Sequence, residues 1–162
     1  MIKKSFLMNQ KESLTNSILS VTALTVVIVA VTIFSVYQKF WIGPIFIVLG
    51  FIHLYILRFF GRSVKTVWPD VVFGTIDNGI LVIVAIIGAD FAGILGAIIG
   101  GAAANAITDG YAGIFEGWTA QYLRKHKIKE GRTAVSSSIA KMAGCFFGAG
   151  IVMVIVWTIL MI

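Results

Sequence analysis

Acidic and amide side chains are concentrated in one apolar part of the chain. Five of the seven acidic residues fall between positions 70 and 116, and the stretch NAITDGYAGIFEG at 105–117 holds two of them. Each residue of a helix advances by about 100°, so Asn105, Asp109 and Glu116 would share one stripe. Asp70 and Asp77 are seven residues apart and would form a second stripe on the preceding helix.

Two such stripes, brought together, have the chemistry of a cation site. Carboxylate and amide oxygens suit hard or borderline divalent cations such as Mg²⁺, Ca²⁺, Mn²⁺ and Fe²⁺. Adjacent carboxylates in lipid repel one another unless they hold protons or share a cation. We therefore predict a metal site made of six residues, with protons exchanged for metal: Asp70, Asp77, Asn78, Asn105, Asp109 and Glu116. The alternatives are hydrogen bonds to neighbouring helices, or a water-filled vestibule.

The composition places these residues in a lipid bilayer. The chain has 162 residues, of which 59% are hydrophobic and 12% charged, too little polar surface to cover a soluble globule. Apolar segments near the membrane-spanning length of roughly 20 residues predict an all-α integral membrane protein that forms one transmembrane domain over 1–162. The five expected helices cover about 17–36, 41–57, 71–89, 91–118 and 135–160.

The positions of the basic residues predict the topology. With five spans, 12 of the 13 Lys and Arg residues fall on one side and only Lys39 falls on the other. Because Lys and Arg near helix ends favour the cytoplasm, the N-terminus is expected inside and the C-terminus outside, in a multi-pass protein of the plasma membrane. The net charge of +6 is then explained by topology and anionic lipid contact. No nucleic-acid partner is expected.

The loop between the third and fourth helices, GADFAG at 88–93, is short enough to impose an antiparallel hairpin. Counting about 1.5 Å per residue along each helix, Asp77 and Asp109 reach a similar depth. Asp70 and Glu116 then fall near the cytoplasmic surface. The hairpin is therefore expected to carry a cytoplasmic pair and an inner pair of carboxylates.

Two stretches carry a resemblance to a known family. The sequence FGTIDNGILVIVAIIGA at 73–89, followed by GAIIGGAAANAITDGYAGIFEGWTAQYLRKH at 96–126, resembles the first hairpin of the vacuolar iron transporter family. The resemblance implies a dimeric exporter of Fe²⁺ and similar metals driven by proton exchange, with Asp77, Asp109 and Glu116 at acidic positions of the family. The chain departs from the family pattern at Asn78, which separates the aspartate from Gly79, and in its basic 123–132 loop.

Other features leave further possibilities open. Small residues four apart, such as Gly96 and Gly100 or Ala140, Gly144 and Gly148, allow close helix packing, either within one chain or in a homo-oligomer, with a dimer expected first. A scaffold that docks partner helices through these glycines is the alternative function. We expect no enzymatic activity and no cofactor, because the sequence lacks a nucleophile set, a metalloprotease motif and a phosphate loop.

Three remaining side chains have mainly structural interpretations. His53 lies near Tyr55 and Arg58 at the end of the second predicted helix, and a structural role is favoured over that of a ligand or proton carrier. Met142 and Cys145 in the last helix are expected to pack against neighbours, with a soft metal ligand as the alternative.

Overall fold

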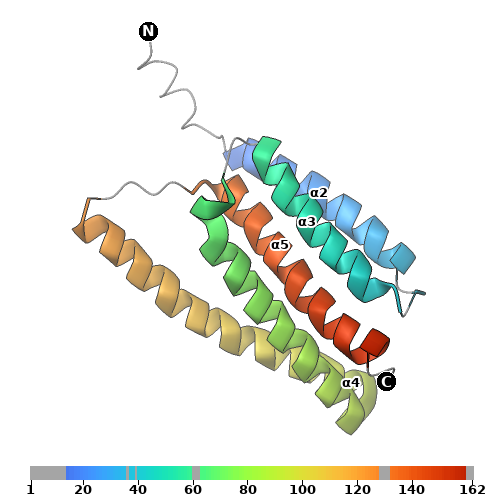
Figure 1. Ribbon diagram of the computed structural model, residues 1–162. Coiled ribbons are helices and arrows are strands. Elements are labelled where there is room, and N and C mark those ends of the chain that lie inside the picture. The colour runs from blue at the N-terminus through green and yellow to red at the C-terminus, as the bar shows by residue number, and fades with distance from the viewer. Residues whose placement is uncertain (1–13, 36, 39, 60–62, 128–131, 160–162) are drawn as a thin grey trace.

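The computed structural model describes residues 14–35, 37–38, 40–59, 63–127 and 132–159. Within these ranges the chain is helical and forms no strand (Figure 1). The elements are α2 (Leu14–Ser35), α3 (Ile42–Phe59), α4 (Val64–Lys125), α5 (Ala134–Met153) and the π-helical turn η1 (Val154–Ile159). The expected all-α class is confirmed. Six basic residues used in the charge argument lie outside the described residues: Lys3, Lys4, Lys11, Lys39, Arg62 and Lys129.

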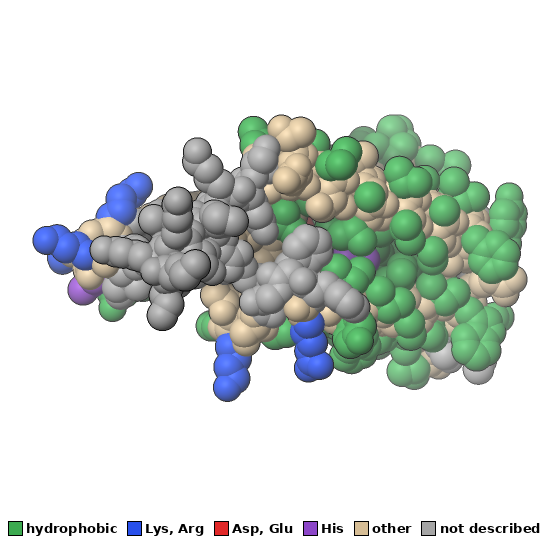
Figure 2. Space-filling view, turned by 90° about the horizontal axis from the view of Figure 1, so that it is seen from above, with side chains coloured by type: hydrophobic (Ala, Val, Ile, Leu, Met, Phe, Trp, Pro, Cys, Tyr) green, Lys and Arg blue, Asp and Glu red, His purple; other side chains and the backbone are tan. Residues whose placement is uncertain are grey.

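The helices have the length and apolarity of membrane spans. Three segments are long and apolar enough to cross a bilayer, namely Leu14–Ser35, Val64–Trp118 and Ala134–Trp157, and Ile42–Arg58 is a shorter apolar helix. Many large hydrophobic side chains are exposed, and Figure 2 shows them over much of the face seen from above. Such a surface suits lipid and not water, which indicates a membrane-integral protein.

Helix α4 is a hairpin, because its backbone reverses near the middle. Ala92 and Gly93 leave the helical conformation, and Gly93 has a φ of 59°, which glycine adopts without steric penalty. A Cβ atom added to Gly96 would lie 1.9 Å from the carbonyl oxygen of Gly88, so only glycines allow the two arms to meet this closely. We call residues 64–91 the first arm and residues 94–125 the second arm. The reversal falls at 92–93, within the expected loop at 88–93.

Helix α5 lies between α3 and the first arm and is the most buried helix of the described part. A Cβ atom on Gly144 or Gly148 would lie 2.1 Å from a backbone oxygen of the first arm, that of Val71 or Thr75 respectively. The contacts advance together along both helices, so α5 and the first arm run parallel. The glycine stripe of α5 therefore serves packing within the chain.

Capping residues set the starts of two helices, and one of these starts differs from the sequence pattern. The Ser63 side chain accepts a hydrogen bond from the Lys65 amide, so α4 begins at Val64, before the expected start at about 71, and Pro69 lies inside the helix. Thr133 and Ser136 form a capping box at the start of α5. Both starts lie at the same end of the bundle as a polar cavity.

Candidate cation site

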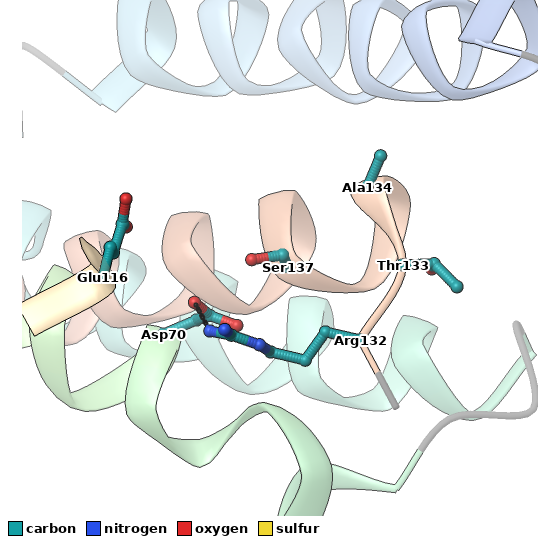
Figure 3. A pocket seen from close by; sticks show the side chains of 6 residues that line it. All are labelled: Asp70, Glu116, Arg132, Thr133, Ala134 and Ser137. Atoms are coloured by element: carbon teal, nitrogen blue, oxygen red, sulfur yellow. Dashed lines mark hydrogen bonds and ion pairs between the residues drawn. The ribbon is translucent and has the colours of Figure 1, made fainter. Parts of the chain in front are cut away.

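A cavity of about 310 Å³ opens between the start of the first arm, the second arm and the start of α5. Its lining is mostly polar (Figure 3). Asp70 comes from the first arm and Glu116 from the second, while α5 and the residues before it contribute Arg132, Thr133, Ala134 and Ser137. The two carboxylates of the predicted cytoplasmic pair thus line one cavity.

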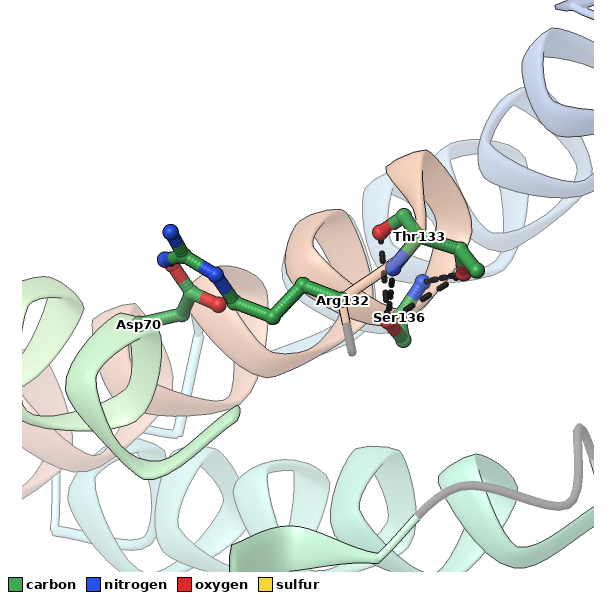
Figure 4. Close-up of polar contacts among 4 residues, drawn as sticks. All are labelled: Asp70, Arg132, Thr133 and Ser136. Atoms are coloured by element: carbon green, nitrogen blue, oxygen red, sulfur yellow. Dashed lines mark hydrogen bonds and ion pairs between the residues drawn. The ribbon is translucent and has the colours of Figure 1, made fainter. Parts of the chain in front are cut away.

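Asp70 forms an ion pair that the sequence patterns do not indicate. Its Oδ1 lies 3.2 Å from Nη1 of Arg132, and the exposed fractions of the two side chains are 8% and 23%. Arg132 directly precedes the capping box, in which the Thr133 amide donates to Ser136 Oγ at 2.9 Å and the Ser136 amide donates to Thr133 Oγ1 at 3.2 Å (Figure 4). The cap fixes the backbone from which the guanidinium reaches Asp70.

The Asp70 carboxylate also interacts with the side chain of Ser137. Oδ2 is buried and receives no hydrogen bond of ordinary geometry from the described residues. Ser137 offers a hydroxyl in the same cavity, and the Glu116 side chain is exposed. With one guanidinium against two carboxylates, the cavity carries a net negative charge whenever both acids are ionised, and this charge favours a cation.

Asp77 lies deeper in the hairpin, between its two arms. Only 5% of the residue is exposed, and its Oδ1 accepts a hydrogen bond from the hydroxyl of Thr108 on the second arm. Within the described part of the chain it forms no ion pair with Lys or Arg. A buried carboxyl group at such a position either holds a proton or, when ionised, needs a cation beside it.

The predicted inner pair does not meet directly. Asp109 is exposed, and its Oδ2 accepts a hydrogen bond of 3.0 Å from the Asn105 side chain one turn earlier. Thr108 takes the place opposite Asp77 that the prediction gave to Asp109. Asn78 is half-buried beside Asp77 on the first arm. No group of three His, Cys, Asp or Glu side chains that could hold a metal ion occurs among the described residues.

The sequence interpretation thus missed two functional candidates, Thr108 and Arg132. The sequence could have indicated Thr108, because this residue directly precedes Asp109 and presents a hydroxyl on the adjacent side of the helix. The signal for Arg132 is its place one residue before Thr133, which with Ser136 can cap a helix.

His53 and Met142 take no part in these contacts, whereas Cys145 lies near enough to Asp77 and Asp109 to interact with them electrostatically. His53 is buried, its Nδ1 lies 2.8 Å from the Leu49 carbonyl oxygen, and its ring centroid lies 5.2 Å from that of Phe146. Met142 packs against the hydrophobic core, and Cys145 is a half-buried free thiol.

No protein-family model, curated protein or solved structure matches the chain. The resemblance to the vacuolar iron transporter family remains a prediction from the residues that carry it.

Proposed function

We propose that the protein transports a divalent metal cation, with Fe²⁺ and Mn²⁺ as first candidates, in exchange for protons. The observation that carries the proposal is the burial of Asp77 between the arms of α4 without a basic partner among the described residues. The interface between the two arms, which we call the seam, ends at the open cavity that Asp70 and Glu116 line. A cation attracted by the cavity would reach Asp77 along the seam.

Thr108 supports the proton half of the exchange. Its hydroxyl has one proton to donate, and three acceptors lie in reach: Asp77 Oδ1, the Ala104 carbonyl at 3.0 Å and the Asn105 carbonyl at 3.1 Å. When Asp77 is ionised, the hydroxyl donates to the carboxylate. When Asp77 is protonated, its O–H donates to Thr108 Oγ1 and the threonine donates to a backbone carbonyl. The pair therefore accommodates both protonation states without a new partner.

The uncovered side of the second arm supports assembly of two copies. No described atom lies within 4 Å of a Cβ built on Gly110, Gly113 or Gly117. The Asn105–Asp109 pair is exposed beside this face. An exposed carboxylate in a membrane span costs roughly 2.5–3.5 kcal/mol on insertion scales, which a second copy covering the pair would relieve. We propose a homodimer with five spans per chain, in which Asp109 and Asn78 complete the ligand set.

Transport is tested with the full chain in proteoliposomes that contain a pH-sensitive dye. Fe²⁺, Mn²⁺, Mg²⁺ and Ca²⁺ are supplied in turn, and metal and proton movements are recorded together. Wild type is compared with Asp77→Asn and with Asp90→Asn, a matched control because Asp90 is exposed next to the reversal of α4. We expect opposed metal and proton fluxes, lost in Asp77→Asn and retained in Asp90→Asn. Folded wild-type protein that moves none of the four ions would refute the proposal.

A scaffold that docks partner helices is the second candidate. The uncovered glycines of the second arm favour it, because small residues permit close approach of any helix. The two functions respond differently to substitution. A scaffold tolerates Asp77→Asn if the hairpin stays folded, whereas a transporter loses flux with its assembly intact.

A further inference from the structure

The second arm of α4 continues past its apolar span. The span ends at Trp118, whereas the helix runs on to Lys125, about 10 Å farther at 1.5 Å per residue. Three rings follow one another at four-residue intervals across this boundary. The ring centroids of Trp118 and Tyr122 are 5.7 Å apart, and those of Tyr122 and His126 are 4.2 Å apart.

This ring stack is accessible in the structure. Trp118 is 64% exposed and Tyr122 46% exposed. Trp and Tyr rings of this kind concentrate at the level of lipid headgroups, where an apolar ring body meets a polar edge. The stack therefore marks the depth at which the second arm leaves the hydrocarbon.

A basic cluster begins where the ring stack ends. Arg124, Lys125 and Lys127 are exposed, and the sequence 117–127 contains no acidic residue. Figure 2 shows Lys and Arg side chains together with a His at the extremity of the molecule where α4 ends. The only acidic group of the second arm near this end is Glu116, which faces the cavity shared with Asp70 and Arg132.

We infer that the end of α4 is a binding surface for anionic phospholipid headgroups. The rings of Trp118 and Tyr122 lie among the upper acyl chains and headgroups, and the three basic side chains bind the phosphates. Charge complementarity selects the ligand, because a cluster of basic side chains next to a span attracts anionic headgroups over zwitterionic ones. The inference rests on membrane insertion and is independent of transport.

The test uses Trp118 as a reporter in the full chain. Trp41, Trp68 and Trp157 are replaced by Phe, and the protein is reconstituted in phosphatidylcholine vesicles with a minority of one brominated lipid. The brominated lipid is either phosphatidylglycerol or phosphatidylcholine, with bromine high on the acyl chains. The ratio of Trp118 quenching by the two lipids gives the headgroup preference at this site.

We expect phosphatidylglycerol to quench Trp118 more strongly, and the preference to fall by about fivefold for each basic residue replaced in Arg124→Gln, Lys125→Gln and Lys127→Gln. Raising the salt concentration should weaken the preference. Lys65→Gln is the matched control, since it removes an exposed charge elsewhere and should leave the ratio unchanged.

Two results would overturn the inference. Equal quenching by both lipids would show a surface without headgroup preference. Quenching by neither lipid would show that protein, such as a second copy of the chain, covers Trp118. Each variant is checked by circular dichroism and gel filtration, and because all the replaced basic side chains are exposed, the fold should be retained.

Discussion

Asp77 on the first arm of α4 accepts a hydrogen bond from Thr108, which lies 31 positions later on the second arm. Both side chains are buried, so this contact holds the arms together at a level from which water is excluded. The bond also fixes the rotation of the second arm about its own axis. With Thr108 turned toward Asp77, Asp109 is directed away from the seam and bonds to Asn105.

Replacement of Thr108 by Val should impair both stability and transport. Valine keeps the shape of the side chain but removes the hydroxyl, leaving the Asp77 carboxylate without this partner. We expect the free energy of unfolding to fall by about 1–2 kcal/mol and metal-driven proton flux to fall at least tenfold. Fluorescence-detected thermal unfolding and the proteoliposome assay provide the two measurements.

Thr108→Ser is the matched control for this prediction, because serine keeps the hydroxyl. It should retain flux within about twofold of wild type. If Val and Ser variants transport equally well, the hydroxyl has no part in proton exchange.

Arg132 should compete with metal for Asp70. In Arg132→Gln the cavity keeps two carboxylates and loses its guanidinium, so binding of a divalent cation should strengthen by at least about tenfold. Because a ligand that binds the folded state raises its stability, titration of the melting temperature with Mn²⁺ measures this affinity.

Two variants bracket this result. Arg132→Lys keeps the positive charge and should behave like wild type, and the double variant Asp70→Asn/Arg132→Gln should lose the gain. Unchanged Mn²⁺ affinity in Arg132→Gln would separate the ion pair from metal binding.

A bulky side chain on the second arm should disrupt assembly without disrupting the chain. No described atom lies within 4 Å of a Cβ on Gly113, so Gly113→Leu should leave the fold of the single chain intact while preventing the proposed dimer. Light scattering of the purified protein in detergent gives the oligomeric state. A Gly113→Leu protein that still forms dimers would exclude this face as the interface.

The contrasting substitution is Gly144→Leu. A Cβ at Gly144 lies 2.1 Å from the Val71 carbonyl oxygen, so leucine must separate α5 from the first arm. We expect a low yield and a melting temperature that is several degrees lower, because overpacking typically lowers the free energy of unfolding by about 1–3 kcal/mol.

Composition and charge predict much of the fold, because a chain this apolar must satisfy its backbone within helices. The helix ends are less predictable. The pattern places the start of the third helix at about 71, but Ser63 caps the helix earlier and Pro69 lies in its second turn. The short GADFAG loop predicts the hairpin, whereas the positive φ of Gly93 determines where the backbone turns.

Spacing alone predicts that Asp70 and Glu116 share one level, and both line the cavity. It does not predict which of Thr108 and Asp109 faces Asp77. These neighbours differ by about 100° around the helix, and the rotation of the second arm depends both on the turn at Ala92 and Gly93 and on the Asp77–Thr108 bond formed in the folded hairpin. Arg132 is 62 positions from Asp70, so only the folded arrangement of α5 reveals their pairing.

The reversal at Gly93 also has a mechanical consequence. The first arm is locked to α5 by backbone contacts at Gly144 and Gly148, whereas the second arm meets its neighbour most closely around Gly88 and Gly96, beside the turn. Among the described residues, the hydrogen bond between Asp77 and Thr108 ties the second arm to the first well beyond the turn. Glu116 lies about 12 Å beyond Thr108, so bending of the arm by about 10° at this contact displaces the carboxylate by about 2 Å. The wall of the cavity formed by Glu116 is therefore the part of the site that bending of the second arm beyond Thr108 displaces.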